Sequence, residues 1–252
     1  MSLWLRCYQQ VARGALVGRI AFFFVSLLIL WSPFALVCYG AGYFLGQVQL
    51  TSTLALVFLY LCFIGNAWFC WLRPFATYGL VFSWSFLADT VLALIFGFGL
   101  VCLLFGGKVL AGLASFQFQP LSAIALEGLV VGIGVGLAEE LLFRGWLLTE
   151  LKTTLPRSQA IVWSSVIFAI AHFIKPLSEV FRTSPQFLGL LLLGIILAAW
   201  RYIHRSTRPF ASLGLPIGLH AGLVWGYYIV DVADLVVPSG RVPEWVTGSH
   251  GN

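Results

Sequence analysis

Long runs of apolar residues, interrupted only by single charged residues, glycines and prolines, dominate this sequence. A transmembrane helix needs about 20 apolar residues to cross the roughly 30 Å hydrocarbon core of a bilayer, and several runs reach that length. Only 9% of the 252 residues are charged and 60% are hydrophobic, whereas soluble domains carry about 25% charged residues. This composition excludes an ordinary soluble domain and a disordered chain. The sequence therefore predicts a polytopic integral membrane protein.

The apolar runs predict an all-α transmembrane helical bundle of about seven spans, and six to eight spans fit the pattern. Charged residues, Gly or Pro bound each run. The predicted spans are residues 20–45, 50–72, 86–110, 121–150, 158–174, 185–203 and 211–232. We expect one membrane domain over residues 1–252, in which residues 1–112 supply amino-terminal spans and residues 119–232 form the functional core.

The basic residues, which give a formal net charge of +5, lie at the ends of apolar runs rather than on one face. This distribution fits anionic lipid headgroups and predicts membrane lipids, not nucleic acid, as the partner. If the seven spans alternate in direction, nine basic residues lie on the same side of the membrane as the amino terminus: Arg6, Arg13, Arg19, Arg73, Lys152, Arg157, Arg201, Arg205 and Arg208. The opposite side has four, namely Lys108, Lys175, Arg182 and Arg241. The positive-inside rule then places the amino terminus in the cytoplasm.

Two adjacent glutamates, Glu139 and Glu140, interrupt the apolar run 121–150. An ionisable side chain near the bilayer centre costs about 2.5–3.5 kcal/mol on insertion scales, so such residues are candidates for function. Glu140 and Arg144 are i and i+4 on one helix, with Glu on the amino-terminal side, which favours an ion pair. Glu139 projects about 100° away from Glu140. We expect Glu140 to hold Arg144 and Glu139 to be left for chemistry; alternatively, both glutamates only neutralise Arg144 and neighbouring polar groups.

Glycines recur every four residues on the same predicted helix, at Gly128, Gly132 and Gly136. Small residues at this spacing allow a second helix to approach closely. We therefore expect another span to pack against this face, which excludes lipid and brings remote side chains toward Glu139.

Two histidines, His172 and His220, lie within the fifth and seventh predicted spans. A single membrane histidine is often only an interhelical hydrogen-bonding residue. With a rise of about 1.5 Å per residue, however, Glu139, His172 and His220 lie roughly 17, 21 and 14 Å from the cytoplasmic ends of their helices. The spacing therefore predicts one layer that contains a carboxylate and two imidazoles.

Such a layer fits two kinds of chemistry, and both lead to amide hydrolysis. Glu139, His172 and His220 could bind a metal that keeps an open position for water. Alternatively, Glu139 and His172 activate water as a general base, while His220 donates a hydrogen bond to the oxyanion. The sequence lacks His-Glu-x-x-His, Gly-x-Ser-x-Gly, Gly-x-Ser-Gly and Gly-x-Gly-Asp motifs. The five cysteines show neither metal-ligand spacing nor a disulfide framework.

Three motifs in chain order carry a resemblance to a known family: Glu139-Glu140-x-x-x-Arg144, then Phe168-x-x-x-His172, then His220. This combination resembles the CPBP family, which contains the CAAX prenyl endopeptidases and the bacteriocin-processing or Abi membrane proteases. The resemblance covers roughly residues 121–232 and makes residues 119–232 a CPBP-like core.

The resemblance implies a glutamic intramembrane endopeptidase that requires no cofactor. It implies that Glu139 and His172 activate water and that His220 helps to form the oxyanion hole, usually with Asn or Asp four residues later. Here that position is Val224, so either the indole N–H of Trp225 substitutes or His220 acts alone. The family's substrates include CAAX-type prenylated proteins, leader peptides and membrane proteins.

Two other classes of function fit the same sequence. A noncatalytic scaffold that binds a peptide or lipid in the polar cavity is favoured by Val224, because one oxyanion donor is missing. A transporter would use the acidic and histidine residues as a proton relay. Cleavage of a substrate that depends on Glu139 and His172 separates the protease from both alternatives.

Overall fold

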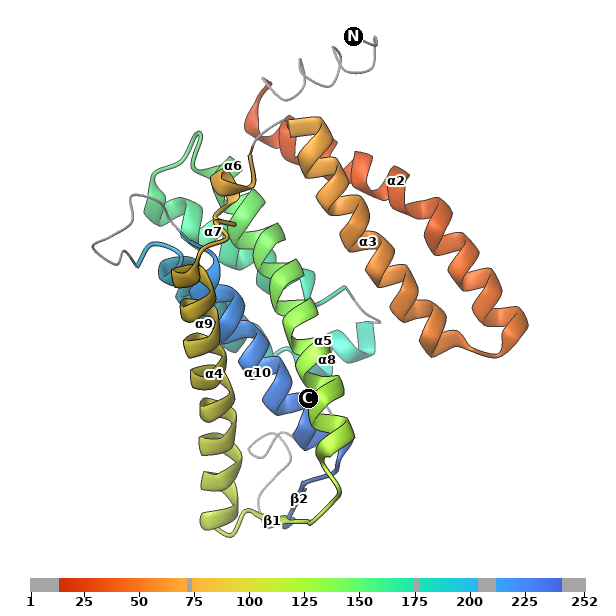
Figure 1. Cartoon of the computed structure of the whole chain (residues 1–252), viewed down its shortest axis with the longest axis vertical. Helices are drawn as coiled ribbons and strands as arrows, with labels where there is room; N and C mark the ends of the chain where they lie inside the picture. The colour runs from red at the N-terminus through yellow and green to blue at the C-terminus, as the bar shows by residue number, and fades with distance from the viewer. Residues whose placement is uncertain (1–13, 72–73, 175–176, 204–211, 242–252) are drawn as a thin grey trace. The chain divides into compact units, whose positions relative to one another are not determined.

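The computed structural model of the chain describes residues 14–71, 74–174, 177–203 and 212–241. These residues divide into two compact units. The first contains the chain up to Thr77 together with Thr149–Pro156, and the second contains Tyr78–Leu148 and the chain from Arg157 onward. The predicted all-α class is confirmed, because helices dominate both units (Figure 1).

The first unit is mainly a pair of packed helices, α2 (Leu16–Leu45) and α3 (Val48–Trp71). The buried amide of Asn66 on α3 donates to the carbonyl of Phe23 at 3.1 Å and to the hydroxyl of Ser26 at 3.1 Å, both on α2. The Trp31 indole donates to the Ala55 carbonyl at 2.8 Å. Interhelical hydrogen bonds of this kind hold apolar helices together where lipid supplies no hydrophobic driving force.

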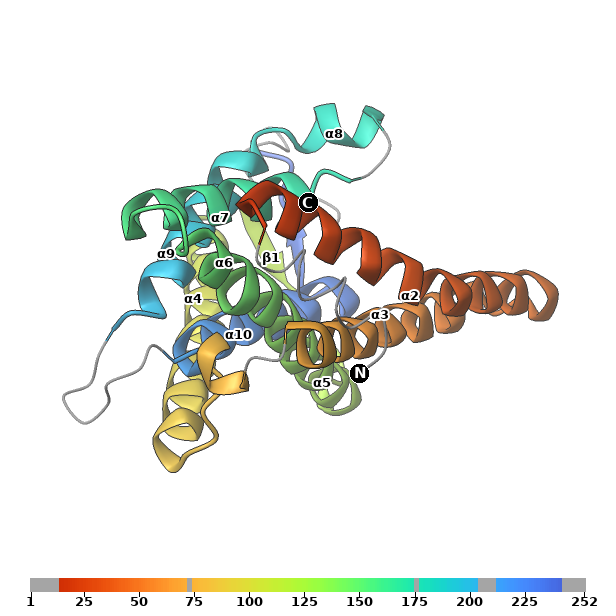
Figure 2. The same cartoon turned by 90° about the horizontal axis from the view of Figure 1, so that it is seen from above.

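Three helices form the centre of the second unit: α4 (Trp84–Leu110), α5 (Ser122–Glu140) and α10 (Gly214–Val232). Helix α10 packs against both α4 and α5 (Figure 2). A Cβ atom at Gly132 would lie 2.6 Å from the Ala221 carbonyl oxygen, and one at Gly218 would lie 2.1 Å from the Thr90 carbonyl oxygen. Only glycine permits backbones to approach this closely. The close helix approach expected from the glycine spacing on α5 is therefore present, and α10 is the partner.

The helix that begins with α5 continues through a π-helix, η2 (Leu141–Leu147), into the short α6 (Leu148–Leu151). Helices α7 (Arg157–Ala171) and α9 (Gln186–Trp200) pack against each other, and α8 (Leu177–Thr183) precedes α9. A 3₁₀ helix, η1 (Phe75–Tyr78), precedes α4. Strands β1 (Ala114–Phe116) and β2 (Val236–Pro238) pair antiparallel, so they join the carboxyl ends of α4 and α10.

Each of the seven predicted spans contains a helix, and the protein is an integral membrane protein. Among the described residues, four helices are long and apolar enough to cross a membrane: Leu16–Leu45, Trp84–Leu110, Ser122–Leu151 and Gly214–Val232. Helices α8 and α9, bent by 74°, give a fifth if they form one span. Two shorter apolar helices, Leu54–Asn66 and Arg157–Ala171, lie within the other predicted spans.

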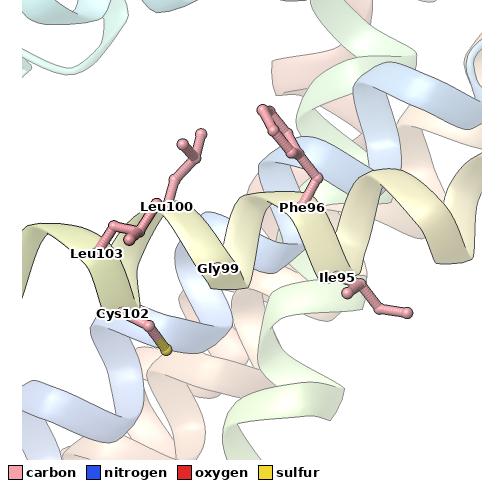
Figure 3. A pocket seen from close by; sticks show the side chains of 6 residues that line it. All are labelled: Ile95, Phe96, Gly99, Leu100, Cys102 and Leu103. Atoms are coloured by element: carbon pink, nitrogen blue, oxygen red, sulfur yellow. The ribbon is translucent and has the colours of Figure 1, made fainter.

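The outer surface of α4 fits a lipid environment. A shallow apolar depression on this helix is lined by Ile95, Phe96, Gly99, Leu100, Cys102 and Leu103, and Figure 3 shows these side chains. Leu103 is 74% exposed and Ile95 is 60% exposed. Apolar side chains are stable at such exposure where hydrocarbon surrounds the helix.

Helix α4, which lies in the predicted amino-terminal segment 1–112, packs against α10. The α10 glycines face α4, whereas the close contact between α10 and α5 is made at the α5 glycines. The division into amino-terminal spans over 1–112 and a core over 119–232 stays a prediction. Several residues behind the predicted orientation lie outside the described residues, namely Arg6, Arg13, Arg73, Lys175, Arg205 and Arg208.

Candidate active site

A buried ion pair joins Glu140, the last residue of α5, to Arg144 in η2. The Arg144 Nη1 atom lies 2.8 Å from Glu140 Oε1, and both side chains are fully buried. The guanidinium carbon also lies 4.0 Å from the centre of the Phe168 ring on α7. A cation–π contact of this kind is strongest where water is excluded. The pairing of Glu140 with Arg144 follows the i,i+4 spacing in the sequence.

The same Glu140 oxygen binds the imidazole of His220 on α10. His220 Nδ1 lies 2.8 Å from Glu140 Oε1, and the His220 side chain is 7% exposed. Because an ionised carboxylate only accepts hydrogen bonds, His220 Nδ1 is the donor in this contact. Glu140 therefore has two partners, Arg144 and His220, and fixes the orientation of the His220 ring.

His172, which directly follows α7, has a different environment. Its Nδ1 atom lies 2.9 Å from the backbone carbonyl oxygen of Phe168. Because a carbonyl can only accept a hydrogen bond, Nδ1 is the donor, and Nε2 is the ring nitrogen that faces Glu139. The Phe168 ring packs edge-on against His172, with centroids 4.6 Å apart.

The Glu139 carboxylate faces both histidines. Its Oε2 atom lies 3.7 Å from His172 Nε2 and 3.9 Å from His220 Nε2. This oxygen is buried and accepts no hydrogen bond from the protein. The side chains of Glu139 and His172 are 24% and 31% exposed. A small molecule can therefore reach the cluster of Glu139, His172 and His220 from the side of Glu139 and His172. The structure thus brings Glu139, His172 and His220 together from three helical segments.

Phe168 is the residue around which the cluster is packed. Its ring is fully buried and contacts the Arg144 guanidinium and both imidazoles, with 6.1 Å between the Phe168 and His220 centroids. Phe168 lies one helical turn before His172 and supplies the carbonyl that fixes its tautomer. A single residue therefore contacts both the Arg144 guanidinium and the His172 ring.

Two residues beside the cluster carry no clear signal in the sequence. The Ser164 hydroxyl on α7 donates to the Phe143 carbonyl at 3.0 Å. Arg201, directly after α9, donates to the carbonyl oxygens of Arg144 and Gly145. The sequence predicts that Arg201 lies in a basic loop at the membrane surface, but the residue is only 5% exposed. The π-helix that accepts these bonds was also not foreseen, because the sequence predicts an ordinary α-helix there.

Trp225 and Val224 lie on α10 beyond His220. The Trp225 indole donates to the backbone carbonyl of Ala125 at 2.8 Å. Its N–H is therefore engaged at a distant part of α5, and the structure does not bring Trp225 into the Glu139 cluster. The side chain of Val224 supplies no hydrogen-bond donor.

Within the parts of the chain that the structure describes, no set of three His, Cys, Asp or Glu side chains has an arrangement that could hold a metal ion. His220 Nδ1 is engaged by Glu140, and His172 Nδ1 by a carbonyl. The Nε2 atoms of both rings face Glu139 Oε2 at 3.7 and 3.9 Å, which is longer than a direct hydrogen bond.

The comparison with known families covers the same segment. Residues 121–226 match the family described as Type II CAAX prenyl endopeptidase Rce1-like. This segment of the chain is similar to that family. It contains Glu139, Glu140, Arg144, Phe168, His172 and His220, and the match confirms the predicted resemblance to the CPBP family. The Rce1-like family is a protease family, whereas no curated protein and no solved structure matches the chain.

Proposed function

We propose that the chain is a glutamic intramembrane endopeptidase that hydrolyses a peptide bond with water activated by Glu139 and His172. The observation that carries the proposal is the buried Glu139 Oε2 atom, which has no hydrogen-bond partner and lies 3.7 Å from His172 Nε2. Two acceptors that each lie about 2.8 Å from one water oxygen are separated by roughly 4 Å. Both atoms therefore fit a single water that donates to each of them.

The bond changes follow from this placement. The water oxygen bonds to the carbonyl carbon of the substrate, and its proton passes to the Glu139–His172 pair. The carbonyl oxygen becomes an oxyanion. The proton is then delivered to the amide nitrogen as the C–N bond breaks, which yields a carboxylic acid and an amine.

His220 supplies the hydrogen bond to the oxyanion in this scheme. Its Nδ1 proton is donated to Glu140, so Nε2 can donate only if the ring carries both protons. The scheme therefore requires a doubly protonated His220 ring whose Nδ1 proton is donated to Glu140 Oε1 at 2.8 Å. The two histidines therefore have different roles. His172, whose Nδ1 contacts a backbone carbonyl, acts with Glu139 as the base, and His220, whose Nδ1 contacts a carboxylate, donates a hydrogen bond to the oxyanion.

The substrate that the Rce1-like match favours is the carboxyl-terminal peptide of a CAAX-type prenylated protein, with leader peptides and membrane proteins as the other classes. The partners are therefore a peptide or membrane-protein substrate and the surrounding lipids. The basic residues place the amino terminus in the cytoplasm. Labelling of a cysteine introduced at the amino terminus in sealed vesicles tests this orientation.

The test of the proposal uses the full chain, purified and reconstituted in liposomes, with a fluorogenic prenylated CAAX peptide. We expect cleavage by the wild-type protein and a loss of at least about 10³-fold with Glu139→Gln or His172→Ala, because the base is removed. Glu127→Gln is the matched control, since Glu127 lies on α5 but is exposed. Full cleavage by both site variants would refute the assignment.

The metal-dependent mechanism has its own test. We expect activity to persist in excess chelator, with no zinc found in the active protein. Activity that is lost to the chelator and restored by Zn²⁺ would instead assign Glu139, His172 and His220 as ligands.

A noncatalytic scaffold is the second candidate, and Val224 favours it, because the usual second oxyanion donor is absent. The scaffold predicts that wild-type protein binds the prenylated peptide without cleaving it and that Glu139→Gln does not change the affinity. Turnover of any validated substrate excludes this candidate.

A further inference from the structure

The π-helix η2 begins directly after the Glu139–Glu140 pair and contains Arg144. π-helices are rare and occur mostly as single turns at functional sites. In η2 the Leu148 N–H donates to the carbonyl of Phe143, five residues earlier. A carbonyl oxygen has two lone pairs, so a carbonyl of this turn can also accept a hydrogen bond from a partner on a neighbouring helix.

Side chains from two neighbouring helices supply such partners. Ser164 on α7 donates to the Phe143 carbonyl at 3.0 Å and is fully buried. Arg201, at the end of α9, donates to the next two carbonyls, those of Arg144 and Gly145, the latter at 3.3 Å. Three consecutive carbonyls of η2 therefore accept bonds from outside the helix.

The packing of α9 on α7 determines where Arg201 reaches η2. A Cβ atom at Gly194 would lie 2.9 Å from the Cβ of Ser165, so the two helices are in close contact at this point. Arg201 follows seven residues later, which is about two helical turns. Helix α9 thus delivers the guanidinium to the same segment that α7 contacts through Ser164 and Phe168.

The burial of Arg201 shows that this contact is specific. A guanidinium is costly to remove from water unless its N–H groups are hydrogen-bonded, and Arg201 is only 5% exposed. An arginine that only bound lipid headgroups would be exposed at the end of its helix. Its bonds to Arg144 and Gly145 go to the backbone, so Arg201 acts through another residue and not on a substrate.

We infer that Arg201 is a positioning residue of the proposed active site. It holds the π-helical turn in which the Arg144 guanidinium meets Glu140, and Glu140 in turn orients His220. The inference rests on the proposed function for its effect on catalysis, whereas its effect on η2 is independent of any activity. Ser164 supports the same turn with a weaker, neutral hydrogen bond.

The first experiment measures backbone hydrogen exchange over residues 141–149 in the purified full chain without substrate. Arg201→Met removes the donors but keeps an unbranched side chain, and Arg201→Lys retains charge and donors. Arg182→Met is the control, because Arg182 is exposed and pairs with Glu179 on α8. We expect exchange to become about tenfold faster in Arg201→Met, to be intermediate in Arg201→Lys and to be unchanged in Arg182→Met.

The second experiment measures cleavage by the same proteins. We expect kcat to fall about 10- to 100-fold in Arg201→Met with KM within about threefold, because a displacement near 1 Å misaligns the reacting groups without removing a binding contact. Arg201→Lys should recover part of kcat. If Arg201→Met does not fold, Arg201→Gln and Ser164→Ala provide the same comparison.

The two readouts separate the inference from the proposed function. Exchange over residues 141–149 that is the same in Arg201→Met and Arg182→Met overturns the inference, whatever the activity. A wild-type protein that cleaves no substrate counts against the proposed function alone. Faster exchange with reduced kcat in Arg201→Met supports both.

Discussion

Replacing Gly132 with alanine is expected to displace α10 next to His220. The added Cβ would lie 2.6 Å from the Ala221 carbonyl oxygen, whereas ordinary contact begins at 3.4 Å, so the helices must separate by about 0.8 Å. Overpacking of this kind costs about 1–3 kcal/mol in free energy of unfolding. Ala221 directly follows His220, so the displacement also moves the imidazole away from Glu139 and Glu140.

The same helix offers a matched control two residues further along. A Cβ at Gly134 has no atom within 4 Å. Both substitutions gain the higher helix propensity of alanine, about 1 kcal/mol. The difference between Gly132→Ala and Gly134→Ala therefore isolates the overpacking at α10, and we expect Gly132→Ala to be less stable by about 1–3 kcal/mol.

The assay is reversible unfolding in mixed detergent micelles, followed by tryptophan fluorescence, with kcat measured on the same preparations. We expect Gly132→Ala to reduce kcat about 10- to 100-fold, because misplacement of a reacting group by about 1 Å has effects of this size. Gly134→Ala should retain the wild-type kcat. Equal stability and equal kcat for the two variants would refute the close packing of α5 on α10.

Three further substitutions test single contacts. Trp225→Phe removes the indole hydrogen bond to the Ala125 carbonyl and should lower the free energy of unfolding by about 0.5–1.5 kcal/mol at unchanged kcat; a loss of kcat of about 100-fold would instead place the indole in the oxyanion hole. Val224→Asn should raise kcat, by up to about 10²-fold, because it restores a second oxyanion donor, and no gain in kcat would count against that geometry. Phe168→Leu removes the ring that lies 4.0 Å from the Arg144 guanidinium and should destabilise the protein by about 2 kcal/mol in thermal unfolding.

The features that sequence reasoning predicted are those set by one helix at a time. Apolar length predicts where the helices lie, because each span must match the bilayer thickness. The i,i+4 spacing predicts the ion pair between Glu140 and Arg144, which lie 2.8 Å apart. The glycine spacing predicts a close helix partner, because small side chains at this spacing let a second backbone approach.

The features that sequence reasoning missed depend on contacts between helices. Nothing in the local sequence shows that Glu140 binds His220, which is 80 residues away. The burial of Arg201 depends on how α9 packs on α7, and the same arginine next to other basic residues has the pattern of a loop. The packing of α4 on α10 joins segments more than 100 residues apart, for example Thr90 and Gly218, and the local sequence of either helix does not indicate it.

The antiparallel ribbon of β1 and β2 has a mechanical consequence for the helices that it joins. Phe116 pairs with Val236 and Ala114 with Pro238, so the ends of α4 and α10 are fastened together just before the chain enters α5. A shift of either helix along its axis by one turn, about 5.4 Å, would break all the residue pairs between β1 and β2. The ribbon therefore fixes the axial position of α4 relative to α10 at their carboxyl ends, whereas His220 lies in the amino-terminal half of α10.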